Sequence, residues 1–180
     1  MAPLPKVGKA GTDILFPSQY LTLLEKARDD RFHDTIVILF HTGMRYEELS
    51  QIDRDHYDQR SGKLCIESGK EKCKNPNRWI PLTPAALQSI ERWIDEGFSP
   101  MARQSFNERA GKIAKYHGFR VSAKTSRKTC ESWRLLLGDD YLKVCTNIGH
   151  TPETAYNHYV QELPFIDEDI EQIKKIFGRE

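Results

Sequence analysis

One apolar run, Thr35-Ile-Val-Ile-Leu-Phe40, does most to restrict the folds open to this chain. By composition alone, such a run suits either a buried strand or a buried helix. It leads into Gly43, a residue suited to the C-cap of a helix, and a second short helix is expected over residues 44–51. We therefore interpret the run as a buried helix rather than a strand.

Helical patterns dominate the rest of the chain. A helix is expected to begin at Pro17, with Ser18 as a candidate N-cap. The apolar residues on one of its faces are Tyr20, Leu21, Leu24 and Ala27. Pro84 opens another helix, which continues to about Trp93. The remaining helices are expected over residues 102–117, 124–137, 140–148, 152–161 and 166–177.

Residues 62–82 have a different character, because apolar residues flank a turn rich in lysine and in Asn-Pro. This pattern predicts a β-hairpin, whose apolar positions are Leu64, Ile66, Trp79 and Ile80. Residues 1–16 hold two prolines and two glycines and are interpreted as a linker or N-terminal arm. The sequence thus predicts one mainly α domain over residues 17–180, with a small antiparallel β-sheet.

Composition and charge suit a globular domain and leave its partner open. The chain has 180 residues, 29% of them charged and 38% hydrophobic, which is enough for one domain with its own core. Its net charge is only +1, so any DNA-facing basic surface has to be local. Two basic clusters are present, although a solvated surface is the commoner explanation for one cluster alone. They are Lys70, Lys72, Lys74 and Arg78, and then Lys112, Lys115, Arg120, Lys124, Arg127, Lys128 and Arg134.

Cysteine spacing and hydropathy predict an intracellular protein. Cys65, Cys73, Cys130 and Cys145 form neither a CxxC pair nor a zinc-binding spacing, so we expect free thiols in a reducing compartment. No stretch approaches the ~20 apolar residues of a membrane span. The N-terminus lacks the apolar segment of a signal peptide. Neither a Walker motif nor a carboxylate cluster is evident, and we expect no metal and no cofactor.

Two arginines are candidates for binding a phosphate group. Cleavage of a phosphodiester requires that charge on the non-bridging oxygens be neutralised, and the planar, permanently charged guanidinium binds such oxygens bidentately. Arg45 and Arg127 each lie at or near an expected helix start, where backbone amides also face an anion. A single arginine is more often a surface residue, so the interpretation depends on the residues around these two.

Both arginines stand in segments that resemble the sequence boxes of tyrosine recombinases and integrases. Gly43-Met-Arg45-Tyr-Glu-Glu48-Leu49 is similar to the first box, in which Gly, an apolar residue and Arg precede Glu-Leu. Glu48 falls on the acidic position, where it either orients Arg45 or is an ordinary solvated carboxylate. The second box, usually His-x-x-Arg, reads Lys124-Thr-Ser-Arg127 here, with the lysine that some archaeal integrases also have. This departure weakens the general-base role of Lys124 more than its phosphate-binding role.

A third segment, Ile148-Gly149-His150, resembles the family's Leu-Gly-His box, and Tyr159 follows His150 at the nine-residue separation that the family shows. The resemblance implies that Gly149 allows a tight turn, that His150 donates a hydrogen bond to the phosphate and that Tyr159 is the nucleophile. A phenol has a pKa of about 10, so neighbouring cations must stabilise the phenolate. Tyr156, one turn earlier, is the chief rival, and the spacing from His150 favours Tyr159.

The lysine-rich turn supplies one more catalytic candidate. It resembles the family's β-hairpin, which has lysine in the turn and closes on Ile/Val-Pro. The distance back from Pro81 makes Lys72 the first choice for the group that protonates the leaving 5′ oxygen. Lys70 and Lys74 stay open as alternatives, because hairpin lengths vary. The DNA-binding residues expected beside the catalytic ones are Lys70, Lys74, Arg78 and Lys128.

The resemblance implies a tyrosine recombinase catalytic domain that cleaves and rejoins DNA through a 3′-phosphotyrosyl intermediate, without ATP or metal. The expected partner is double-stranded DNA, bound by a homotetramer. Helix 166–177 either docks on a neighbouring protomer or packs on its own domain. The length predicts a catalytic fragment or a minimal integrase, from a virus, plasmid or transposon. Two alternatives stay open: a type IB topoisomerase-like strand transferase, and a non-catalytic DNA-binding domain of the same fold.

Overall fold

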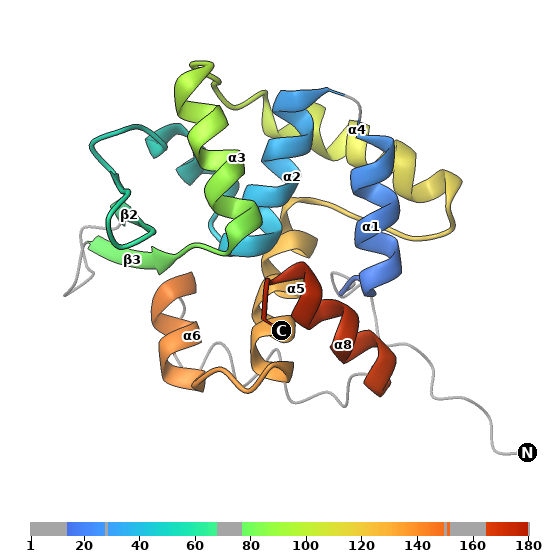
Figure 1. Ribbon diagram of the computed structural model, residues 1–180. Coiled ribbons are helices and arrows are strands. Elements are labelled where there is room, and N and C mark those ends of the chain that lie inside the picture. The colour runs from blue at the N-terminus through green and yellow to red at the C-terminus, as the bar shows by residue number, and fades with distance from the viewer. Residues whose placement is uncertain (1–13, 28, 68–76, 150, 152–164, 180) are drawn as a thin grey trace, which may run out of the picture.

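The computed structural model describes residues 14–27, 29–67, 77–149, 151 and 165–179, and it arranges helices around a buried helix with a small sheet to one side (Figure 1). The helices are α1 (Pro17–Lys26), α2 (Asp30–Thr42), the 3-10 helix η1 (Tyr46–Gln51), α3 (Pro84–Asp95), α4 (Arg103–Tyr116), α5 (Ala123–Leu136), α6 (Tyr141–Ile148) and α8 (Asp167–Ile176). The strands are β1 (Tyr57–Asp58), β2 (Lys63–Glu67) and β3 (Asn77–Pro81). This confirms the predicted fold class, mainly α with a small antiparallel sheet. The helix predicted over residues 152–161 lies outside the described residues.

Helix α2 forms the centre of the core. Its apolar run from Ile36 to Phe40 is at most 3% exposed. Helices α3 and α5 pack against it and contribute Trp93 and Trp133, which are also buried. A helix that is covered on several sides needs apolar residues on every face. The prediction of a buried helix over this run is therefore confirmed.

The sheet has the order β1-β2-β3, with all neighbours antiparallel. Leu64 pairs with Ile80, and Ile66 pairs with Arg78, so these four side chains share the inner face. Trp79 alternates to the other face and is 49% exposed. Because α6 packs against β3, and inward-facing Arg78 donates to the Asn147 carbonyl, the inner face of the sheet lies next to the C-terminal end of α6.

The segment just before α1 packs on the domain. Residues 14–16 belong to the packed domain: the Leu15 N–H donates to Thr129 Oγ1, and Trp133 Nε1 donates to the Leu15 carbonyl. The N-cap of α1 is Phe16 rather than Ser18, because Pro17 takes the first helical position. Tyr20 is buried as predicted, whereas Leu21, predicted on the same apolar face of α1, is exposed and Leu23 is buried instead. Residues 1–13 of the expected arm lie outside the described residues.

Helix α8 packs on its own domain, which was one of the two outcomes considered. Ile173 and Phe177 are buried, and the Phe177 ring stacks on His41 of α2 at 5.0 Å between centroids. Phe165 contacts Phe16 at the start of α1. Ile166 remains 58% exposed.

Two expectations from composition can be compared with the described residues. Within them, no helix has the length and apolar character that crossing a membrane requires. Cys65, Cys130 and Cys145 are free and buried. Cys73 lies outside the described part of the chain.

Candidate active site

A tight turn after α2 brings the first sequence box against α5 and α6. Gly43 ends α2 with φ 63°, a left-handed conformation that side chains disfavour. A Cβ at this position would lie 3.1 Å from Ile148 and 3.2 Å from the sulfur of Cys130. The absence of a side chain therefore allows the end of α2 to approach the end of α6 and the middle of α5, and Arg45 follows two residues later at this junction.

Glu48 fixes the orientation of Arg45 from inside the protein. Its Oε2 accepts the backbone N–H of Arg45 at 2.6 Å, and its Oε1 accepts Arg45 Nη1 at 3.1 Å. Glu48 is only 6% exposed, and the arginines around it hold the pKa of its carboxyl below the usual value, against the effect of burial. Glu48 is therefore a buried, hydrogen-bonded carboxylate rather than a solvated one. The remaining arm of Arg45, Nη2, donates to the Gly149 carbonyl at 3.1 Å.

Arg78 also contacts Glu48, whereas the hairpin sequence suggested that Arg78 contacts DNA. Its side chain is 7% exposed, its Nη2 donates to Glu48 Oε2, and its Nε donates to the Asn147 carbonyl at 3.0 Å. Among the described residues its Nη1 has no hydrogen-bond partner. Sequence reasoning missed this placement, although one signal pointed to it. Arg78 stands two residues before the buried Ile80, so the two share a strand face.

Arg127 reaches the same junction from α5. Its Nη1 donates to the Gly43 carbonyl at 2.7 Å, which joins the second box to the turn before the first. Burial and then the neighbouring positive charge of Arg45 lower the pKa of Arg127 to about 10. The carboxylates of Glu48 and Glu131 act in the opposite direction without reversing the shift. The guanidinium keeps its charge near neutral pH, at a site where positive charge exceeds negative.

We call Arg45, Glu48, Arg78 and Arg127 the Glu48 cluster. Its members come from segments far apart in the sequence, and an anion such as a phosphate would relieve its excess of positive charge. Lys124 is exposed on the first turn of α5, three residues before Arg127 and so on the same side of that helix. Lys128 is half-buried. No group of histidine, cysteine, aspartate and glutamate side chains suited to a metal ion occurs within the described residues.

The third box meets the cluster through its glycine. Gly149 follows α6 with φ 78°, as the predicted tight turn requires, and its N–H donates to the Cys145 carbonyl at 2.8 Å. His150, the next residue, and Tyr159 lie outside the described residues, as do Lys70, Lys72, Lys74 and the rival Tyr156. Their predicted roles stay predictions.

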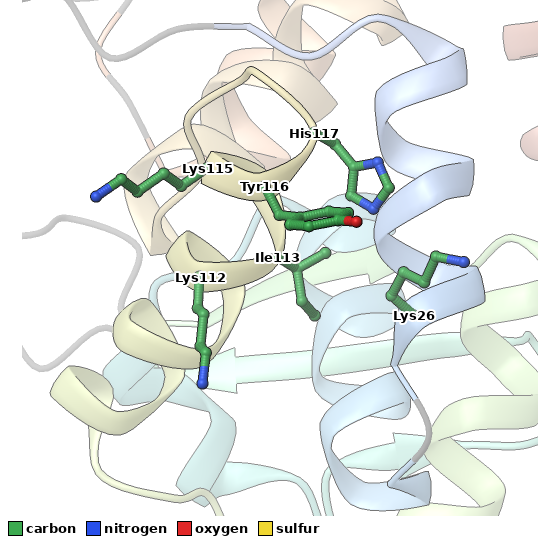
Figure 2. Close-up of a pocket in the computed structure, with 6 residues that line it drawn as sticks. All are labelled: Lys26, Lys112, Ile113, Lys115, Tyr116 and His117. Carbon is green, nitrogen blue, oxygen red and sulfur yellow. The ribbon is translucent and has the colours of Figure 1, made fainter.

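The second basic cluster of the sequence is divided in the structure. Arg134 is buried and ion-paired with Asp139. Lys112 and Lys115 instead line a cavity of about 610 Å³ beside the C-terminal end of α4. Figure 2 shows Lys26 of α1, His117 and the ring of Tyr116 around the same cavity. The Tyr116 side chain is 86% exposed.

Residues 14–163 match the model of the Phage integrase family. This chain belongs to the phage integrase family. No curated protein matches the sequence significantly.

Solved structures show which fold this integrase chain has. The XerA recombinase superposes with a TM-score of 0.70 at 16% identity, over 91% of this chain and 64% of that one. The Tn1549 transposon integrase in complex with transposon right end DNA superposes with a TM-score of 0.72 at 16% identity, over 97% of this chain and 69% of that one. The XerH site-specific recombinase bound to difH substrate superposes with a TM-score of 0.65 at 20% identity, over 84% of this chain and 51% of that one. The fold is that of a tyrosine recombinase catalytic domain, and the integrase chain spans less than two thirds of the length of the XerA chain.

Proposed function

We propose that this integrase cleaves and rejoins DNA strands as a site-specific tyrosine recombinase. One observation carries the proposal most directly: Arg45 and Arg127, from two separate boxes, converge at the Gly43 turn with their charges close enough that Arg45 lowers the pKa of Arg127. Such a pair suits the non-bridging oxygens of a scissile phosphate. Glu48 supports the proposal because it fixes the direction of Arg45.

In the proposed reaction the Tyr159 phenol gives up its proton to solvent, the resulting phenolate oxygen attacks the phosphorus, and the bond to the 5′ oxygen breaks. The products are a 3′-phosphotyrosyl link and a 5′ hydroxyl, whose proton comes from Lys72. Attack by the 5′ hydroxyl of another strand reverses these steps, so neither ATP nor a metal ion takes part. We assign phosphate contacts to Lys124 and His150 as well, since an exposed lysine suits charge pairing better than general-base chemistry.

The proposed partner is double-stranded DNA, bound by a homo-oligomer that we expect to be a tetramer. The Tn1549 integrase and XerH structures contain DNA, and they share the fold of this chain. Lys70, Lys74 and Lys128 remain the proposed DNA contacts beside the catalytic residues. We add Lys112 and Lys115, because they line the same pocket as an exposed aromatic ring, and lysines beside an aromatic ring suit phosphates and bases.

A nicked suicide DNA tests the proposal, because the short 5′-hydroxyl fragment diffuses away and the covalent adduct accumulates. We expect an adduct that resists denaturation and forms in excess EDTA. DNA binding without an adduct would favour a non-catalytic domain of this fold. Relaxation of supercoiled DNA without exchange of strands between short duplexes would favour the topoisomerase-like alternative. Loss of cleavage in EDTA, with recovery in magnesium, would contradict the metal-free mechanism.

The role of Lys72 has its own test. A general acid matters only while the leaving group is poor, and a 5′-bridging phosphorothiolate leaves as a thiolate that needs no proton. Lys72→Ala is expected to be slow on normal DNA and close to wild type on the sulfur substrate, whereas Arg127→Ala stays slow on both. If Lys72→Ala is equally slow on both substrates, Lys72 is not the acid. The same pair of substrates then tests Lys70, Lys74 and finally Lys124.

A further inference from the structure

Arg78 connects three separate segments of the fold at the edge of the candidate active site. It projects from the inner face of β3, where its guanidinium is almost completely buried. Nη2 donates to Glu48 of η1 at 2.5 Å, and Nε donates to the Asn147 carbonyl, near the end of α6, at 3.0 Å. A buried guanidinium that donates to two acceptors in fixed directions restrains the distance between those two acceptors.

Both acceptors lead to Arg45. The Glu48 oxygen that accepts Arg78 also accepts the Arg45 backbone N–H, at 2.6 Å. Asn147 lies two residues before Gly149, whose carbonyl accepts Arg45 Nη2. Gly149 itself packs on Arg78, since an added Cβ would lie 3.4 Å from the Arg78 Cζ. Arg78 thus contacts the two groups that orient the Arg45 guanidinium.

We propose that Arg78 is a positioning residue for DNA cleavage: by holding Glu48 and the end of α6 at a fixed separation, it aligns Arg45 with the scissile phosphate. This inference rests on the proposed function. The simpler explanation is that Arg78 only neutralises the buried charge of Glu48. Neutralisation needs one positive charge, whereas positioning needs a planar fork that reaches two acceptors at once.

Arg78→Lys separates the two explanations, because it keeps the charge and loses the fork. The thermal unfolding midpoint should stay close to wild type. The affinity for the suicide DNA should change by no more than about threefold, since the exposed phosphate contacts remain. The single-turnover rate of adduct formation should fall about 100-fold, the scale of a small misplacement of a catalytic group. Arg78→Met, which removes the charge as well, should lose both stability and rate.

Arg92 provides a matched control. Its Nε and Nη2 both donate to the buried Asp34 at 2.8 Å, so it too pairs with a buried carboxylate, but it links α3 to α2. Arg92→Met should lower the unfolding midpoint. At temperatures well below that midpoint it should cleave at the wild-type rate, which separates lost stability from lost positioning.

A double-mutant cycle with Arg45→Lys tests whether Arg78 acts through Arg45. If it does, Arg78→Lys should lower the single-turnover rate of adduct formation about 100-fold when Arg45 is present, and less than about threefold in the Arg45→Lys background. A 5′-bridging phosphorothiolate should not rescue Arg78→Lys, because the defect concerns phosphate charge and not the leaving group.

Four outcomes would overturn the inference. They are a wild-type rate for Arg78→Lys, an equal loss in both Arg45 backgrounds, rescue by the sulfur substrate, and an equal loss of rate in Arg92→Met. In each of these the wild-type protein still forms its adduct, and the proposed function stands. A wild-type protein that binds the suicide DNA and forms no adduct contradicts the proposed function, and the inference about Arg78 with it.

Discussion

Two carboxylates in this integrase are each held by two arginines, and the two groups differ in their balance of charge. Glu48 is bonded to Arg45 and Arg78, with Arg127 close by. Asp139 is bonded to Arg134 and Arg179. We call Asp139, Arg134 and Arg179 the Asp139 cluster. It joins the loop after α5 to the residues that follow α8, and so closes the domain on itself.

One arginine of each cluster has a shifted pKa, and the two shifts have opposite directions. The hydrogen bond to Asp139 raises the pKa of Arg179, as expected where the carboxylate satisfies the cation. Burial and like charge lower the pKa of Arg127 instead. A structural ion-pair cluster is electrostatically satisfied, whereas a site that awaits an anion retains repulsion between its cations. This contrast supports the proposal that the scissile phosphate binds at the Glu48 cluster.

The largest predicted effect contrasts one arginine from each cluster. Arg127→Ala should slow adduct formation on nicked suicide DNA by about 10²–10³-fold, because charge that develops on the phosphate loses a fixed partner. Arg127→Lys should recover only part of this loss, since the fork geometry is absent. Arg179→Ala should cleave within about twofold of wild type, because surface ion pairs contribute little. Comparable losses of rate in Arg127→Ala and Arg179→Ala would remove the distinction between the clusters.

A smaller effect is expected from two glycines that share a left-handed conformation. Gly149, with φ 78°, packs on Arg78, whereas Gly138, with φ 82° and next to Asp139, has open space where a Cβ would lie. Alanine at either position should cost about 1 kcal/mol in the free energy of unfolding. Only Gly149→Ala should also slow cleavage, by about 10-fold, because it displaces the carbonyl that holds Arg45. Denaturant unfolding and single-turnover cleavage measure the two quantities, and a comparable slowing in Gly138→Ala would contradict the assignment.

The sequence predicted much of this arrangement, because its signals were local. The helix end at Gly43, the hairpin and the turn at Gly149 each follow from residues within a few positions of one another. The contacts of Arg78 with Glu48 and Asn147 join segments that are distant along the chain, and no local pattern encodes such pairing.

The errors in the predicted details of α1 have one tertiary and one local cause. Leu21 and Leu23 both fit a helix, and tertiary packing decided which one is buried. Ser18 has the chemistry of an N-cap, but Pro17 already occupies the first helical position.

The smallest predicted effect on cleavage belongs to the Asp139 cluster, which is tested by pH. Arg179 and Arg134 hold the pKa of the Asp139 carboxyl below its usual value, although burial opposes this. The folded state therefore favours the ionised carboxylate. The resulting stability is present above the unfolded-state pKa of about 3.9 and is lost as the pH falls through the lower folded-state pKa.

Asp139→Asn should accordingly lower the free energy of unfolding by about 1–2 kcal/mol at pH 7. Its stability should approach that of wild type in strong acid, while its cleavage rate at neutral pH stays unchanged. Thermal unfolding across the acid range provides the measurement. A pH-independent difference would show that the ionisation of Asp139 is not what the mutation removes, and a slow variant would place the Asp139 cluster within the catalytic machinery.

The most direct test of the account is to identify the residue that becomes linked to DNA. Adduct trapped on nicked suicide DNA is digested with nuclease and protease, and mass spectrometry locates the peptide that carries the residual nucleotide. The account predicts the nucleotide on the Tyr159 oxygen, no adduct from Tyr159→Phe despite retained DNA binding, and normal adduct from Tyr156→Phe. A nucleotide on Tyr156 or on any other residue, or an adduct that persists in Tyr159→Phe, would contradict it.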